Sequence, residues 1–181
     1  MLGFTLQYEM SYTNILNMLD MSGITIRASE RGEEEPIIMA GGPCAYNPEP
    51  LYDVVDFFEI GEGEEMMNDV LEVYAKHKAN GKVNKKEFLR EISKIGGIYV
   101  PSLYDVTYNE DGTIKEFTPK YEDVPAKVKK RIVNNFDAVS FPDEMIVPYT
   151  DIVHDRVVLE TARGCTNGCR FCQAGMIYRP V

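Results

Sequence analysis

Two short apolar runs that end in glycines constrain the fold of this 181-residue chain more than any other feature. The first, "PIIMAGG", covers residues 36–42, and the second, "VVDFFEIGEGEE", covers residues 54–65. Apolar runs of this length, bounded by turn residues, are typical of strands that are buried on both faces. A helical pattern follows each run, and strands that alternate with helices predict an α/β fold with a parallel sheet.

The same alternation continues on both sides of these runs. "LGFTLQ", residues 2–7, predicts a first strand at the start of the chain. Short polar side chains and proline mark where helices begin, and glycines mark where they end. The predicted helices are one capped by Ser11 or Thr13, one beginning at Asn47 and Pro48, one over 64–79, and one over 85–95 with Asn84 and Glu87 as a capping box.

The pattern changes after residue 97. "GIYVPSLYDVTYNEDGTIKEFTP" predicts two strands joined at its Glu-Asp-Gly turn, and "VPAKVKKRIVNN" predicts a short basic helix. The residues from 137 to 155 are expected to be a linker. We therefore predict the fold class α/β, with an incomplete parallel-sheet domain over 1–97, an α+β connector with a hairpin over 98–155, and a last segment over 156–181.

The charge and the apolar content limit what this chain can bind. The net charge of -10 argues against a grip on nucleic acid or on an anionic membrane, and no apolar run approaches the roughly 20 residues that span a bilayer. Residues 156–181 carry +3, so the rest carries -13, which favours a boundary near Asp155. The first residues lack the pattern of a secretory signal, which favours the cytoplasm, where thiols stay reduced.

Three of the four cysteines lie within eight residues, in "ETARGCTNGCRFCQAG" at residues 160–175. "RVVLETARGC" predicts a strand that leads into them. A reducing compartment argues against a disulfide, which would also leave one thiol over. A structural zinc site needs four ligands, and the fourth would have to be Cys44 or His154. Three unrelated core cysteines are a further alternative, although this spacing rarely arises by chance.

An iron–sulfur cluster is the alternative that this cysteine pattern favours. Thiolates are the usual cluster ligands, and three of them leave one iron of a four-iron cluster without a protein ligand. Gly164 and Gly168 allow the backbone to wrap closely around such a cluster, and Arg163 and Arg170 bring positive charge near an anionic group.

The spacing Cys165-x-x-x-Cys169-x-x-Cys172, with Phe171 before the third cysteine, resembles the signature of radical S-adenosylmethionine (SAM) enzymes. The resemblance implies that these three cysteines hold a 4Fe–4S cluster whose open iron binds SAM, and that Phe171 lies near the adenine. It implies reductive cleavage of SAM to a 5′-deoxyadenosyl radical, with flavodoxin or ferredoxin as the electron donor. The cluster loop would then follow the first strand of a partial barrel.

"AGGPCAYNPEPLYDVVDFFEIGEGEE" resembles an uncharacterised branch of that superfamily, in which a flavodoxin-like, cobalamin-binding type of domain precedes the barrel. This resemblance adds cobalamin as a candidate cofactor. The implied ligand contacts are Gly41, Gly42, Gly61, Glu62 and Gly63. These glycines are also ordinary turn residues, and the sequence lacks the Asp-x-His-x-x-Gly pattern that supplies a histidine to cobalt.

The resemblance also implies a larger protein. A barrel needs roughly six strand–helix units, so we expect this chain to be a fragment, truncated at both ends, that does not sustain catalysis alone. RNA modification, methyl transfer and methylthio transfer are all compatible with the motif, and the substrate stays unknown. Two other classes remain open, a non-catalytic iron–sulfur electron-transfer module and a zinc-stabilised binding module.

Overall fold

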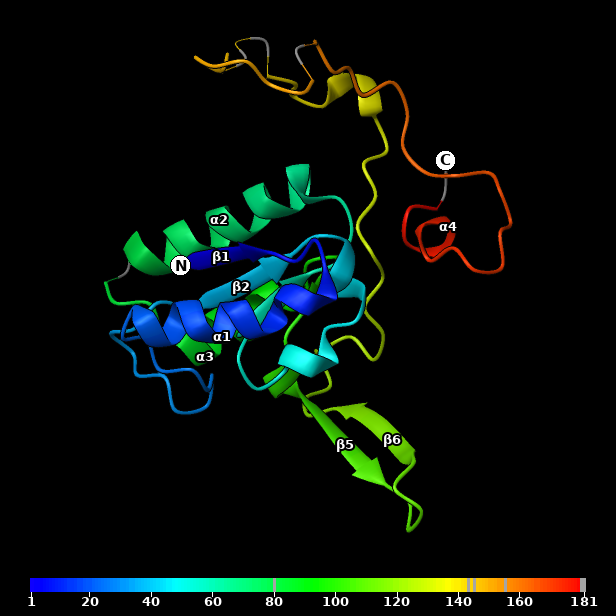
Figure 1. Ribbon diagram of the computed structural model, residues 1–181. Coiled ribbons are helices and arrows are strands. Elements are labelled where there is room, and N and C mark those ends of the chain that lie inside the picture. The colour runs from blue at the N-terminus through cyan, green and yellow to red at the C-terminus, as the bar shows by residue number, and fades with distance from the viewer. Residues whose placement is uncertain (80, 143, 145, 155, 180–181) are drawn as a thin grey trace. The chain divides into compact units, whose positions relative to one another are not determined.

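The computed structural model describes residues 1–79, 81–142, 144, 146–154 and 156–179 (Figure 1). The chain forms two compact units, 1–134 and 135–181. The domain boundaries expected after residues 97 and 155 stay predictions, and Asp155 lies outside the described residues.

The first unit is built on a four-stranded sheet in the order β1-β2-β3-β4. The strands are β1 (Leu2–Thr5), β2 (Ile38–Gly41), β3 (Phe57–Glu59) and β4 (Ile98–Tyr99). The first three are parallel, which confirms the predicted α/β class, and β4 runs antiparallel to β3. Two helices separate β3 from β4. The chain therefore enters β4 at the end of the sheet where β3 finishes.

Three helices accompany this sheet: α1 (Tyr12–Met21), α2 (Gly63–Ala79) and α3 (Lys85–Ile92). The cap predicted for α3 is confirmed, because the Asn84 side chain accepts hydrogen bonds from the backbone N–H groups of Lys86 and Glu87. Helix α1 does begin after Ser11, but the Ser11 hydroxyl donates to the Tyr8 carbonyl instead of capping the helix.

The helix predicted at Asn47 and Pro48 is wrong. The segment between β2 and β3 holds only two short 3-10 helices, η2 (Pro43–Tyr46) and η3 (Glu49–Leu51). Prolines at 43, 48 and 50 remove the backbone donors that a continuous α-helix would need. This segment therefore crosses from strand to strand in tight turns.

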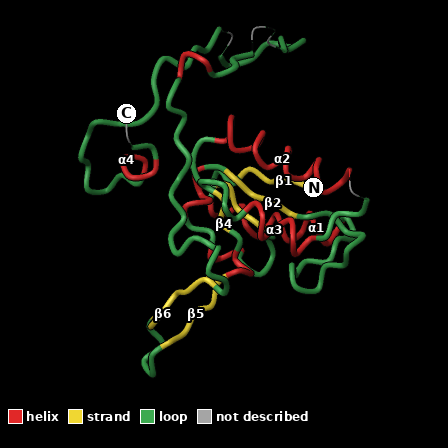
Figure 2. Tube along the Cα trace, turned by 180° about the vertical axis from the view of Figure 1, so that it is seen from behind, coloured by secondary structure: helices red, strands yellow, loops and turns green. Residues whose placement is uncertain are grey.

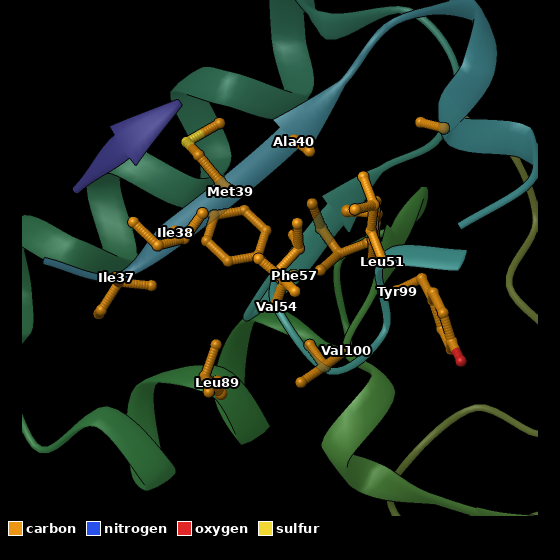
Figure 3. Close-up of a cluster of buried hydrophobic side chains, with 14 of the residues drawn as sticks. Ile37, Ile38, Met39, Ala40, Leu51, Val54, Phe57, Leu89, Tyr99 and Val100 are labelled. Atoms are coloured by element: carbon orange, nitrogen blue, oxygen red, sulfur yellow. The ribbon is translucent and has the colours of Figure 1, made fainter. Parts of the chain in front are cut away.

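Aliphatic side chains make up most of the core of the first unit (Figure 3), and aromatic rings link its strands to its helices. Phe57 of β3 is fully buried and meets Phe88 of α3 edge to face, with ring centroids 6.3 Å apart. Phe88 makes a similar contact with Tyr74 of α2 at 5.7 Å. The neighbouring Phe58 stacks on Tyr99 of β4 at 6.1 Å, which fixes the last strand in place.

A hairpin of β5 (Tyr104–Tyr108) and β6 (Ile114–Pro119) follows η4 (Pro101–Leu103) and projects from the sheet (Figure 2). Its turn lies at the predicted Glu-Asp-Gly sequence, where Gly112 has a φ of +81°. The short basic helix predicted after the hairpin is wrong. Residues 124–135 contain no helix, and Arg131 instead pairs with Gly61 in an isolated parallel bridge.

The second unit contains little regular structure in its described residues. Its helices are η5 (Phe136–Ala138) and α4 (Ala174–Ile177). The strand predicted at "RVVLETARGC" is not formed, since residues 156–165 carry no strand. A strand needs a neighbour to satisfy its backbone hydrogen bonds, and the described part of this unit supplies none.

A buried carboxylate, Asp56, connects four segments of the first unit. One oxygen accepts from Arg31 Nη1 at 2.6 Å and from the Ile38 backbone N–H at 2.7 Å, and the other lies 2.7 Å from Lys85 Nζ. The Arg31 side chain is fully buried and also donates to the carbonyls of Thr25, Ile26 and Val54. This cluster joins the loop after α1 to the starts of β2, β3 and α3.

Replacing Asp56 by Asn removes the negative charge and leaves Arg31 buried without a counter-charge. We expect Asp56→Asn to lower the free energy of unfolding by about 3–5 kcal/mol. Urea unfolding at neutral pH measures it. Asp53→Asn is the matched control, because Asp53 pairs with Arg27 at 3.4 Å in an exposed position and should cost at most about 1 kcal/mol. Equal losses in both variants would contradict this role of Asp56.

Candidate functional site

The three clustered cysteines lie in a loop of the second unit that ends at α4. Cys165 and Cys172 are half-buried and Cys169 is exposed, and all three are free thiols. The Cys172 backbone N–H donates to the Cys169 carbonyl at 3.2 Å, which makes the second gap a tight turn. Across the described residues, no three Cys, His, Asp or Glu side chains are gathered as a metal site. The three thiols are close together in the sequence, but their side chains are not gathered around one point.

Contacts of its own residues close this loop. Arg179 Nη2 donates to the Asn167 carbonyl at 2.8 Å, which ties the end of the segment back to the stretch between the first two cysteines. Gly175 of α4 lies against the same carbonyl, 3.5 Å from where a Cβ would be. Gly164 has a φ of +93°, so the turn into the loop uses a conformation that favours glycine.

Of the charged and aromatic residues next to the cysteines, Arg163 is held by other side chains, whereas Arg170 and Phe171 are exposed. Both ends of the Arg163 guanidinium bind the Glu160 carboxylate at 2.8 Å, and this pairing lowers the pKa of Glu160. The Arg163 guanidinium also lies 5.1 Å from the centre of the Phe136 ring. Arg170 is exposed, and Phe171 is 92% exposed, so both side chains are accessible from solvent.

The predicted ligand contacts of the first unit lie at the carboxyl ends of β2 and β3. Gly42 has a φ of +101°, and a Cβ there would lie 2.9 Å from the Leu6 carbonyl oxygen. Gly61 has a φ of +116°, and its Cβ would overlap the Arg131 backbone. The Glu62 N–H donates to the Arg131 carbonyl at 3.0 Å. Close contacts with the protein's own backbone thus account for glycine at positions 42 and 61. Ligand contact at these two residues stays a prediction.

Glu59, at the end of β3, is a functional candidate that the sequence analysis missed. A Cβ on Gly41 would lie 3.6 Å from Glu59 Cβ, and one on Gly63 would lie 4.0 Å from Glu59 Oε2. Glu59 is 6% exposed, and its Oε1 accepts no hydrogen bond from the described residues. Burial raises the pKa of this carboxyl to about 7. A glutamate inside the apolar run "FFEI" was the available signal.

The remaining candidates have ordinary surroundings. His77 lies 2.8 Å from the Glu91 carboxylate and packs on Phe88, while His154 contacts Arg156. Cys44 is buried beneath Tyr12, whose hydroxyl donates to the Cys44 carbonyl at 3.0 Å. Cys44 and His77 lie in the first unit, whereas His154 lies in the second unit, eleven residues before Cys165.

Comparison with known proteins identifies the family. The model of the N-terminal region of radical SAM proteins matches residues 1–101, more than half of the chain. The chain belongs to the radical SAM family. The matched residues include the four-stranded sheet and Glu59, so the first unit of this radical SAM chain carries the family likeness.

One relative extends the likeness to the cysteine loop. This radical SAM chain is 28% identical over 177 residues to an uncharacterized protein of Methanocaldococcus jannaschii, which covers 97% of the chain. The chain spans only 30% of that relative's length. No solved structure matches this radical SAM chain. Among the described residues, no helix is long and apolar enough to cross a membrane.

Gly61→Ala tests whether the chain itself requires a glycine at the end of β3. The new methyl group would overlap the Arg131 backbone, so we expect a loss of about 2–4 kcal/mol in the free energy of unfolding. Gly81→Ala is the matched control, since Gly81 has a φ of +118° but no atom within 4 Å of a Cβ. Urea unfolding of both variants should therefore show the larger loss at Gly61. A loss at Gly81 as large would assign the effect to backbone strain alone.

The pKa of Glu59 predicts a pH dependence of stability. With a folded pKa near 7 and an ordinary value of 4.5, the folded state holds the proton more tightly, so stability falls as pH rises from about 4.5 to 7 and then levels off. This shift corresponds to about 3 kcal/mol. Glu59→Gln, measured by urea unfolding at several pH values, should remove that part of the dependence. Glu116→Gln, on exposed β6, should leave it unchanged.

Proposed function

We propose that this radical SAM chain holds a 4Fe–4S cluster through Cys165, Cys169 and Cys172, and takes part in the reductive cleavage of SAM. The spacing of three free thiols within eight residues carries the proposal. The family membership supports it independently, because the family model matches residues 1–101 and not the cysteines.

The donor set fits such a cluster. Thiolates are its usual ligands, and three of them leave a fourth iron open to a small molecule. A Cβ on Gly168, between the first two cysteines, would meet no atom within 4 Å, so the backbone there has free space beside it. When bound, the cluster would supply the electron that splits SAM and yields a 5′-deoxyadenosyl radical.

The protein's own residues have separate tasks in this proposal. The three thiols bind the metal, and the bidentate pair of Arg163 with Glu160 holds the approach to Cys165 in one conformation. The exposed Arg170 contributes positive charge beside an anionic group, and the exposed ring of Phe171 is available to the adenine of SAM. A reduced electron carrier, flavodoxin or ferredoxin, and a cytoplasmic location belong to the same proposal. The substrate is left open.

Cobalamin is not part of the proposal. The spaces at Gly42 and Gly61 are filled by the backbones of Leu6 and Arg131. The chain has two histidines, and each contacts another side chain. These contacts give cobalamin no support, and its contact with Gly41, Gly42, Gly61, Glu62 and Gly63 stays a prediction.

Single cysteine variants test the cluster. After anaerobic reconstitution with iron and sulfide, we expect the chain to bind close to four irons and to absorb broadly near about 400 nm. Cys165→Ala, Cys169→Ala and Cys172→Ala should each lose most of the iron and the absorption. Cys44→Ala is the matched control, because that buried thiol lies in the first unit and should not affect iron content.

Metal analysis and SAM binding separate the alternatives. A colourless protein with one zinc would support a zinc-stabilised module and overturn the proposal. Equilibrium dialysis of labelled SAM should show binding only when the cluster is present, since the open iron is its binding point. A cluster that binds no SAM would indicate an electron-transfer module instead.

A further inference from the structure

A cavity of about 850 Å³ lies in the first unit, at the end of the sheet where β2 and β3 begin. This is the end opposite to Gly41, Gly61 and Glu59, so the cavity is separate from the positions described above. Residues from the loop after α1, the segment before β3, the start of α3 and the base of the hairpin form its walls. Its volume lies within the roughly 300–1,000 Å³ that is typical of small-molecule sites.

Aromatic rings form one wall of this cavity. Tyr104 and Phe117 stack with centroids 4.9 Å apart, and Tyr99 lies 5.4 Å from Tyr104. At the rim, Tyr52 is 53% exposed and Tyr108 is 63% exposed. Tyr99 and Tyr104 are buried, so the exposed rings of Tyr52, Tyr108 and Phe117 are the ones on which a flat ring can stack.

Lysines and a helix start provide positive charge beside the aromatic wall. Lys85 is held by Asp56, but the exposed Lys86, in the first turn of α3, has no ion-pair partner among the described residues. Lys120, on the other side, donates to the Ser102 carbonyl at 2.9 Å and lies 3.5 Å from Asp105. An anionic group in the cavity would find these ammonium groups and the N-terminus of α3.

The acids in the lining are mostly neutralised. Glu33 and Asp53 pair with Lys82 and Arg27, and Asp56 lies between Arg31 and Lys85. Glu49 is the exception, because the described residues give it no cation, and it accepts only from the Tyr99 hydroxyl, at 2.6 Å. The Glu49 carboxylate can therefore accept a further hydrogen bond from a donor group on a bound ligand.

We propose that this cavity binds a nucleotide that carries an amino group on its base. The base stacks on the aromatic wall, the phosphate meets Lys86 and Lys120, and the amino group donates to Glu49. This cavity brings together exposed rings, ammonium groups and a carboxylate acceptor.

The test titrates the full chain with adenosine 5′-monophosphate (AMP), adenosine, inosine 5′-monophosphate and inorganic phosphate by isothermal calorimetry. We expect AMP to bind at least about tenfold more tightly than adenosine, which lacks the charge, and phosphate alone to show no binding. Inosine monophosphate presents an oxygen where AMP presents the amino group, so it should bind more weakly than AMP. Absence of AMP binding, or equal affinity for all four compounds, would overturn the proposal.

Paired variants localise the binding. Tyr108→Ala should weaken AMP binding about tenfold or more, and Tyr8→Ala is its control, because Tyr8 is also 63% exposed but lies outside the cavity. Lys86→Ala should weaken AMP and leave adenosine unchanged, whereas Lys129→Ala should change neither. Binding that falls equally in the controls would place the nucleotide elsewhere.

One further variant separates this cavity from the cysteine loop. Cys165→Ala, which the proposed function expects to lose the cluster, should bind AMP as the unaltered chain does. Loss of AMP binding in that variant would assign the nucleotide to the cluster and overturn the proposal of a second site.

Discussion

The fold of the first unit depends on one carboxylate. Asp56 lies just before β3, and its two oxygens reach a backbone N–H of β2, a guanidinium from the loop after α1 and an ammonium from α3. The Arg31 guanidinium then binds three carbonyls of neighbouring turns, so the irregular loop before β2 becomes fixed. Arg31, Asp56 and Lys85 also line the cavity of the first unit, and the hairpin contributes Tyr104 and Phe117 to its aromatic wall.

Local signals predicted those parts of the fold that depend on a few adjacent residues. The apolar runs became β2 and β3, Asn84 caps α3 as expected, and the turn at Gly112 closes the hairpin. The basic helix predicted over residues 124–135 was wrong, because the conformation of that stretch depends on a distant segment. The basic stretch around Arg131 pairs with Gly61 instead of forming a helix, and nothing in its own sequence indicates that partner.

The candidate sites also differ in whether they depend on adjacent residues or on distant ones. Three cysteines within eight residues are visible in the sequence, because metal-ligand spacing is a local property. Glu59 is different, since its importance comes from burial and from the absent side chains of Gly41 and Gly63 beside it. The cavity is also invisible in the sequence, because its aromatic and lysine side chains come from segments that are far apart along the chain.

The bridge between Gly61 and Arg131 has a consequence for the carboxyl edge of the sheet. Two backbone hydrogen bonds, from Glu62 to Arg131 and from Arg131 to Ile60, hold this later segment where a strand-end ligand would lie. A molecule entering there would have to displace the segment and replace those bonds. The segment around Arg131 would therefore compete with any ligand for this edge of the sheet. Binding of the ligand and docking of the segment would be mutually exclusive.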